Sequence, residues 1–162
     1  MSYLAGKSEV SHITEFKIST QEKTMSAENT RKVIQRFMDN VESLKLLEAF
    51  GMLAEDGTWT IIGKCPASRT FNGRKELFEL LLPMLGGFKQ PPQIRFSPPI
   101  VEGDRAVMLG SGRGIGPTGI VYDQPHYAWV TRVRGDEIVE IIEFLDTGAL
   151  ETAVFGKKIV DA

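Results

Sequence analysis

Apolar residues recur every three or four positions in the first half of the chain. One such series predicts an amphipathic helix that begins near Ser26; its apolar positions are Val33, Ile34, Phe37, Met38, Val41 and Leu44. A second series predicts a helix from about residue 43 to Gly57, with Leu46, Leu47, Phe50 and Leu53 on one face. A third helix is expected from Arg74 to Leu82, where Pro83 ends or bends it. Between the last two, residues 58–62 (TWTII) are β-branched and aromatic and predict a strand.

After Gln93 the helical period disappears and strand patterns follow. Four strands are expected over residues 94–101, 105–113, 120–134 and 137–145, and Gly135-Asp136 predicts a hairpin between the last two. Thr147 is expected to cap a short closing helix that runs through Phe155. Helices first and strands last indicate an α+β fold, in which a curved antiparallel sheet forms a cone closed by the N-terminal helices. Such a cone encloses an apolar cavity.

Composition excludes several classes of function. The length of 162 residues fits one domain. Charged residues make up 25% of the chain, and the net charge of −2 argues against general nucleic-acid binding. One cysteine, Cys65, and two histidines leave no disulfide and no metal-ligand cluster, and we expect no cofactor. No apolar stretch is long enough for a membrane span or a signal peptide, so a cytoplasmic protein is expected. Residues 1–25 are interpreted as an N-terminal extension and residues 26–162 as the domain.

Glycines fall at every second position from Gly110 to Gly116. This spacing matches neither the dinucleotide-binding pattern nor the phosphate-binding loop, and no βαβ unit surrounds it. Alternate glycines on one face of a strand instead allow a sheet to bend or a neighbouring element to approach closely.

The last predicted strand carries the most informative charge. Because strand residues alternate between faces, Glu143 shares a face with Val139, Ile141 and Leu145. A carboxyl among apolar side chains is normally either paired or shifted towards its neutral form, and a raised pKa suits a general acid. The alternative that stays open is a structural ion pair, or a face that meets solvent.

Neighbouring strands offer partners for Glu143. Arg113 ends an apolar face with Val107, Leu109 and Ser111, and we expect it to pair with Glu143. Tyr127 and Trp129 share a face and are expected to pack in the core or in an interface. His126 titrates near neutral pH, although a lone histidine is usually structural. Pro125 predicts a bulge or an edge strand, which leaves the facing of residues upstream of it open.

Four segments together resemble the nuclear-transport-factor-like superfamily, which has a cystatin-like α+β barrel. They are residues 33–39 (VIQRFMD), 53–59 (LAEDGTW), 71–74 (FNGR) and 138–147 (IVEIIEFLDT). More narrowly, they resemble SnoaL-type polyketide cyclases, limonene-epoxide-hydrolase-like proteins and ketosteroid isomerases. The resemblance spans residues from about 28 to 156 and implies the fold more strongly than the activity.

The resemblance distinguishes among the activities of this group. The epoxide hydrolases use an Asp-Arg-Asp set, and the matching positions here are Ser111, Arg113 and Glu143; water-holding groups would fall at Trp59 and Ile61. The ketosteroid isomerases place a base near Ile61 and a tyrosine near Phe37, and neither group is present. A SnoaL-type cyclase needs little more than one acid or base in an apolar pocket. The resemblance assigns that role to Glu143 first and to His126 or Asp123 second.

The sequence therefore predicts a small cofactor-independent enzyme. It would act by general acid/base catalysis on an apolar, oxygenated, cyclic substrate of polyketide, terpenoid or steroid type, as a cyclase, isomerase or dehydratase (a lyase). Glu143 would move the proton and Arg113 would support it; the expected pocket walls are Trp59, Phe37, Phe50, Ile61, Ser111 and Tyr127. The alternatives are a non-catalytic ligand-binding or dimerisation module of the same fold, and an epoxide hydrolase with an altered acid set. A homodimer through the open face of the sheet is expected in each case.

Overall fold

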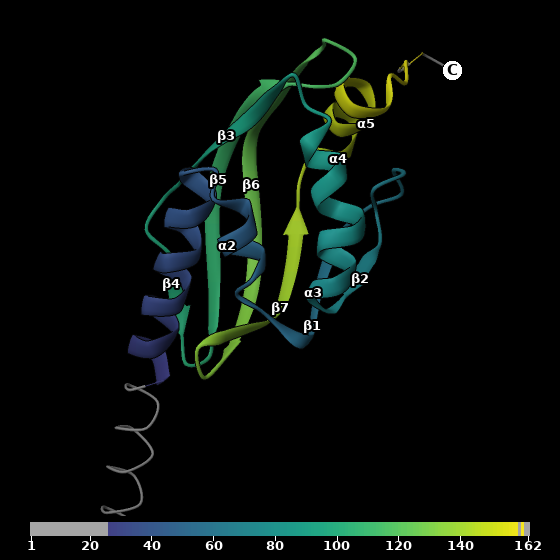
Figure 1. The fold of residues 1–162 in the computed structure, drawn as a ribbon. Coiled ribbons are helices and arrows are strands. Elements are labelled where there is room, and N and C mark those ends of the chain that lie inside the picture. The colour runs from purple at the N-terminus through teal and green to yellow at the C-terminus, as the bar shows by residue number, and fades with distance from the viewer. Residues whose placement is uncertain (1–25, 159, 161–162) are drawn as a thin grey trace, which may run out of the picture.

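A layer of helices covers one face of a seven-stranded sheet (Figure 1). The structure is a computed structural model and describes residues 26–158 and 160. The extension predicted over residues 1–25 lies outside the described residues. Within them, no helix combines the length and apolar character that crossing a bilayer would require.

The first two helices are shorter in total than the sequence predicts. The opening helix covers residues 26–42, and α2 covers only Leu46–Phe50. The prediction of a helix that continues to Gly57 is wrong, because the chain turns at Gly51 and then enters strand β1 (Leu53–Ile61). Leu53 is buried as a residue of β1, where it pairs with Ile138 of the neighbouring strand. An apolar residue at this position therefore fits a helix and a strand equally well.

The third helical segment runs past its proline. It consists of α3 (Gly73–Glu76), a π-helical stretch over Leu77–Leu81, and α4 (Leu82–Gly86). Pro83 does not end the helix, which continues for another three residues to Gly86. The π turn ends at Leu81, two residues before Pro83, whose ring removes one backbone donor and crowds the preceding turn.

The strands form a mixed sheet. Besides β1 they are β2 (Thr70–Asn72), β3 (Gln90–Phe96), β4 (Ile100–Glu102), β5 (Arg105–Ile115), β6 (Val121–Arg134) and β7 (Glu137–Phe144). Their order is β2-β1-β7-β6-β5-β3, and β4 adds to β5. All pairs are antiparallel as predicted, except that β1 and β7 run parallel. A parallel pair needs a long crossover, and residues 62–136 lie between these two strands.

A bulge at Pro125 determines which side chains of β6 face the helices. Gly110 pairs with Tyr127 and Gly112 with Gln124, so one residue of β5 faces two residues of β6. The predicted bulge is confirmed. Because of the extra residue, Tyr122 and Gln124 before it face inward like Tyr127 and Trp129 after it.

The closing helix α5 (Thr147–Phe155) is capped one residue earlier than predicted. The carboxylate of Asp146, not Thr147, accepts hydrogen bonds from the backbone N–H groups of Gly148 and Ala149 at 2.8 and 3.2 Å. The buried Gln124 side chain bonds both backbone groups of Asp146, at 2.7 and 2.8 Å. Strand β6 thus fixes the start of α5.

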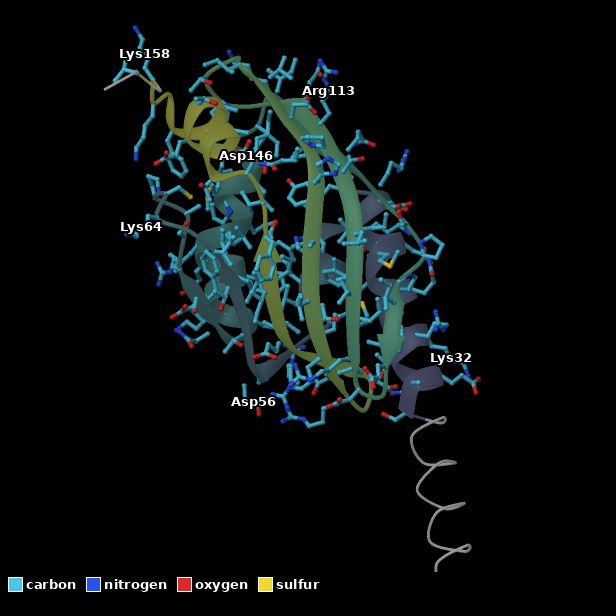
Figure 2. All side chains as sticks on the ribbon, turned by 180° about the vertical axis from the view of Figure 1, so that it is seen from behind. Lys32, Asp56, Lys64, Arg113, Asp146 and Lys158 are labelled. Atoms are coloured by element: carbon cyan, nitrogen blue, oxygen red, sulfur yellow. The ribbon has the colours of Figure 1, made fainter. Side chains whose placement is uncertain are left out.

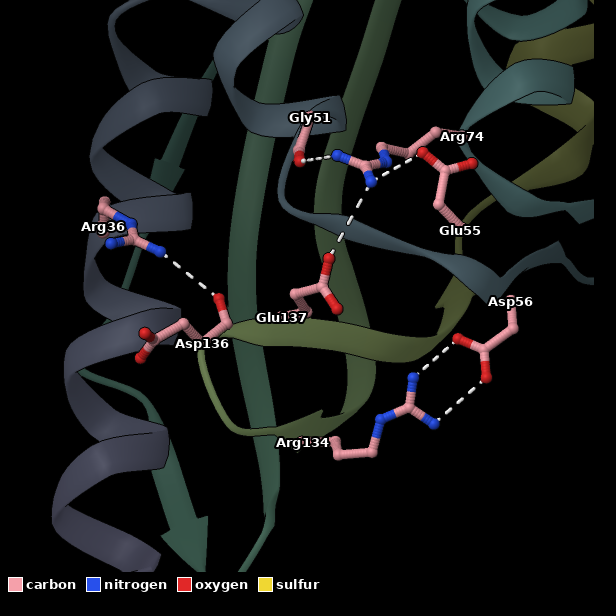
Figure 3. Close-up of polar contacts among 8 residues, drawn as sticks. All are labelled: Arg36, Gly51, Glu55, Asp56, Arg74, Arg134, Asp136 and Glu137. Carbon is pink, nitrogen blue, oxygen red and sulfur yellow. Dashed lines mark hydrogen bonds and ion pairs between the residues drawn. The ribbon is translucent and has the colours of Figure 1, made fainter.

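Arg74 joins three elements at the other end of the sheet (Figure 3). Its guanidinium donates to the carbonyl of Gly51 at 3.2 Å and lies 2.6 Å from Glu55 and 3.9 Å from Glu137. Nearby, Arg134 makes two hydrogen bonds to Asp56. The side chain of Arg74 is 30% exposed and that of Arg134 is 60% exposed, so water screens the second pair more strongly.

We expect Arg74→Met to lower the free energy of unfolding by about 1–2 kcal/mol, because it leaves the Gly51 carbonyl and Glu55 without their partner. Arg134→Met, the matched control, should shift the urea midpoint far less, because both of its partners are exposed. Equal shifts for the two variants in urea unfolding would contradict the assignment of Arg74 as the structural arginine.

Candidate functional site

A narrow apolar cavity lies between the inner face of the sheet and the helices. Its volume is about 80 Å³, and helical side chains such as Phe50, Leu81 and Leu85 form one wall. The sheet supplies the polar groups, which are the carboxyl of Glu143, the hydroxyls of Tyr122 and Tyr127, and the indoles of Trp59 and Trp129. Drug-sized ligands usually occupy roughly 300–1,000 Å³. The cavity as it stands therefore fits only a small part of such a molecule.

Glu143 is buried among these side chains, with 8% of its surface exposed. The Trp59 indole N–H donates a 2.9 Å hydrogen bond to its Oε2. The parallel pairing of β1 with β7 makes this contact possible, because Ile61 pairs with Glu143 and Trp59 faces inward two residues earlier. Within the described residues, the other carboxyl oxygen, Oε1, accepts no hydrogen bond.

Burial raises the pKa of Glu143 to about 7. The indole N–H groups of Trp59 and Trp129 oppose this shift, because a nearby donor favours the charged carboxylate. The loss of hydration of the carboxylate raises the pKa by more than the two indole groups together lower it. A carboxyl with this pKa exchanges its proton close to neutral pH, which is the property that general acid/base catalysis requires.

The indole N–H of Trp129 is buried and has no hydrogen-bond partner among residues 26–158 and 160. Trp129 sits directly across from Glu143 in the antiparallel pairing of β6 with β7. A buried donor without a partner costs about 1–3 kcal/mol. This N–H lies close enough to the Glu143 carboxyl to favour its charged form, but it completes no hydrogen bond within the described residues.

Two tyrosines supply a second polar point on the cavity wall. The hydroxyls of Tyr122 and Tyr127 lie 2.7 Å apart in a hydrogen bond. Burial raises the pKa of both hydroxyls well above the usual value, so both stay neutral. A Cβ on Gly112 would lie 2.9 Å from the Tyr127 ring, so the close approach of ring and strand requires glycine at this position.

Aromatic rings hold the two tryptophans in place. Trp59 and Trp129 meet with ring centroids 5.6 Å apart, and Phe37 lies 6.1 and 5.9 Å from them. Phe50 packs edge-on against Trp59 at 5.3 Å. These tilted and edge-on contacts are the arrangements that aromatic pairs favour, and they fix the direction of the indole N–H groups.

The structure brings together five of the residues predicted for the site. Glu143, Trp59, Phe50, Ile61 and Tyr127 all line the cavity. Phe37 does not line it, because it packs behind the two tryptophans with 1% of its surface exposed.

The remaining predicted residues lie on the outer face of the sheet. Arg113 and Ser111 do share a face with Leu109 as predicted, but that face points away from the helices, because Gly110, Gly112 and Gly114 occupy the inner face of β5. Figure 2 shows Arg113 at the exposed end of the sheet. Asp123 and His126 are exposed as well. The expected ion pair between Arg113 and Glu143 is therefore wrong.

Tyr122 is the main site residue that the sequence analysis missed. It lies five positions before Tyr127, and an odd separation normally places two strand residues on opposite faces. The bulge at Pro125 reverses this relation. Pro125 was the available signal, because it already marked the facing of upstream residues as open.

Comparison with known proteins places the fold. No protein-family profile matches the chain, and no curated protein matches it. Among solved structures, an NTF2-like protein from Burkholderia xenovorans LB400 is 24% identical, with a TM-score of 0.64, over 80% of this chain and 98% of that one. A putative SnoaL-like polyketide cyclase from Jannaschia sp. CCS1 is 14% identical, with a TM-score of 0.65, over 82% and 96%. TerC, co-crystallised with polyporic acid, is 16% identical, with a TM-score of 0.66, over 77% and 97%. The chain therefore has the NTF2-like fold, as the resemblance implied.

The raised pKa of Glu143 predicts a pH-dependent stability. From about pH 4.5 to pH 7 the folded protein holds a proton on this carboxyl that the unfolded chain has released, so the free energy of unfolding falls as pH rises. The fall from pH 5 to pH 8 should be about 2–3 kcal/mol. Glu143→Gln removes this contribution, so urea unfolding of the variant should lose that much less over the same range. Parallel curves for the two proteins would contradict the assigned pKa.

Proposed function

We propose that the protein is a cofactor-independent enzyme in which Glu143 acts as a general acid/base on a small, oxygenated, largely apolar substrate. The ionised carboxylate would take a proton from one atom of the substrate, and the resulting neutral acid would return it to another. Such a transfer produces an isomerisation or a cyclisation, or a dehydration when the proton goes to a departing hydroxyl. The proton that Glu143 takes up is the proton that it returns, so the transfer needs no cofactor.

The observation that carries the proposal is a single titrating carboxyl in an apolar cavity. Its pKa is about 7, its Oε2 is held by Trp59, and its Oε1 accepts no hydrogen bond from the described residues. Tyr122 and Tyr127, whose neutral hydroxyls bond each other, and Trp129 line the same cavity. These donors favour a substrate with a carbonyl or hydroxyl oxygen.

Two neighbours in fold support a small organic substrate. One is described as a putative SnoaL-like polyketide cyclase, and the other was co-crystallised with polyporic acid. The cavity volume of about 80 Å³ favours a compact reacting group over a fused ring system at Glu143. We therefore place the oxygenated end of the substrate there.

The alternative activities are less well supported. An epoxide hydrolase with an altered acid set would need Ser111 and Arg113 beside Glu143, and both lie on the outer face. A non-catalytic ligand-binding or dimerisation module of this fold predicts that Arg113 and Glu143 form a closed ion pair with no cavity beside them. Within the described residues Glu143 has no cationic partner, and it lines a cavity.

Hydrogen–deuterium exchange at the carbon next to the carbonyl of cyclopentanone tests the proton-transfer role. In D₂O the protein should accelerate this exchange, and the rate should rise from pH 6 to pH 8 with an apparent pKa of about 7, because the carboxylate is the active base. Glu143→Gln should reduce the protein-dependent rate by at least about 100-fold.

Glu140→Gln is the matched control, because Glu140 is on the same strand and faces Arg132 on the sheet's other side. It should exchange at the wild-type rate. Exchange at the same rate in Glu143→Gln, or none above buffer in the wild type, would contradict the proposal.

We also propose that the protein forms a homodimer through the outer face of the sheet. This face has no helix over it (Figure 2), and it exposes Leu109 and Phe144 to 44% and 42%. A two-fold dimer buries the same patch on each copy, so these two side chains would cover their equivalents.

Phe144→Asp should convert a dimer to a monomer in sedimentation analysis, because it places a charge in the buried patch. Leu80→Asp is the control: Leu80 is 43% exposed but belongs to the helical layer, so its variant should stay dimeric. A monomeric wild-type protein would overturn this part of the proposal.

A further inference from the structure

We propose that a second apolar hollow beside the cavity binds the chain-like tail of an amphipathic substrate. The hollow, called the vestibule below, has a volume of about 160 Å³ and is lined by Val41, Leu44, Leu46, Leu82, Leu85, Gly86, Pro91, Pro92 and Ile94. Its lining residues come from the opening helix, α2, α4 and β3 and from the turn between the first two helices. This inference rests on the proposed function, because it names the substrate class of the same site.

The vestibule and the cavity have walls in common. Five residues line both: Val41, Leu46, Leu85, Pro92 and Ile94. The two spaces are therefore adjacent, with these five side chains between them. A molecule with its polar end at Glu143 would extend into the vestibule once these apolar side chains move apart.

The chemistry of the two spaces differs. The cavity holds the carboxyl, hydroxyl and indole groups, whereas every residue that lines the vestibule is aliphatic, glycine or proline. The vestibule also has twice the volume of the cavity. A ligand gains binding free energy there only by burying apolar surface, which contributes about 0.8 kcal/mol for each methylene group. A short oxygenated head followed by a saturated chain fits this division.

The entrance to the vestibule carries an unusual backbone. Leu44 lines it, is 39% exposed and has a φ of 57°, in the left-handed region that side chains other than glycine rarely adopt. For a leucine this conformation costs about 1–2 kcal/mol. The backbone N–H groups of Leu44 and Lys45 donate to the carbonyls of Val41 and Asn40 at 3.0 and 2.8 Å, so this conformation ends the opening helix and places the Leu44 side chain against the vestibule.

Binding of 2-alkanones, from 2-pentanone to 2-nonanone, tests the inference. Their carbonyl imitates the oxygenated head, and the intrinsic fluorescence of Trp59 and Trp129 reports on the cavity that both line. We expect the dissociation constant to fall by about fourfold for each added methylene until the vestibule is full.

Gly86 offers a matched pair of variants. A Cβ at this position meets nothing within 4 Å, so Gly86→Phe adds a ring to the vestibule wall without a backbone clash, and Gly86→Ala adds only a methyl group. Gly86→Phe should bind 2-pentanone like the wild type but show no further gain with chain length. Gly86→Ala should keep the wild-type dependence.

Each outcome decides the inference. A fourfold gain per methylene that Gly86→Phe removes and Gly86→Ala keeps supports it. Chain-length dependence that persists in Gly86→Phe, affinity independent of chain length in the wild type, or no binding of any alkanone overturns it. The proposed function is judged separately, by exchange of cyclopentanone, which has no tail and does not need the vestibule.

Discussion

The site depends on one contact between strands that are far apart in the chain, the hydrogen bond from the Trp59 indole to the Glu143 carboxyl. It exists because β1 and β7 run parallel, with Ile61 paired to Glu143, so that both side chains project from the same face of the sheet. The bond holds one carboxyl oxygen of a side chain that lines the cavity. Without a fixed partner, a buried carboxyl would turn towards water or remain neutral at all physiological pH values.

The surrounding rings make this contact rigid. Phe37, Phe50 and Trp129 pack against Trp59 at centroid distances between 5.3 and 6.1 Å, so the indole has little freedom to rotate. A general acid/base must be held within hydrogen-bond reach of the proton that it moves. Phe37, which does not touch the cavity, therefore contributes to the site by supporting both indoles.

Much of the fold was predictable wherever the local pattern agreed with the final structure. The strand at 137–145, the hairpin at Gly135 and the bulge at Pro125 are all present. Glu143 was found because the alternation along one strand suffices to place a carboxyl among apolar neighbours. Arg113 was misplaced because alternation says which residues share a face, but not which face the helices cover. Tyr122 was missed because a bulge elsewhere on its strand decides its direction. The parallel β1–β7 pair could not be predicted either, since strand partners distant in sequence are set by the whole topology.

Several features that reduce stability gather around the cavity and its entrance. A titrating carboxyl is buried there, the Trp129 N–H has no partner among the described residues, and Leu44 adopts a left-handed backbone at the rim. Away from the cavity the buried side chains of Gln124 and Thr131 have their hydrogen bonds. In the described part of the chain the one other buried side-chain nitrogen without a partner is Nε of Arg74, and its guanidinium bonds the Gly51 carbonyl through another nitrogen. A chain optimised for packing alone would place an apolar residue at position 143 and glycine or asparagine at position 44. Costs confined to one cavity are what a binding or catalytic role predicts, because a ligand compensates for them only there.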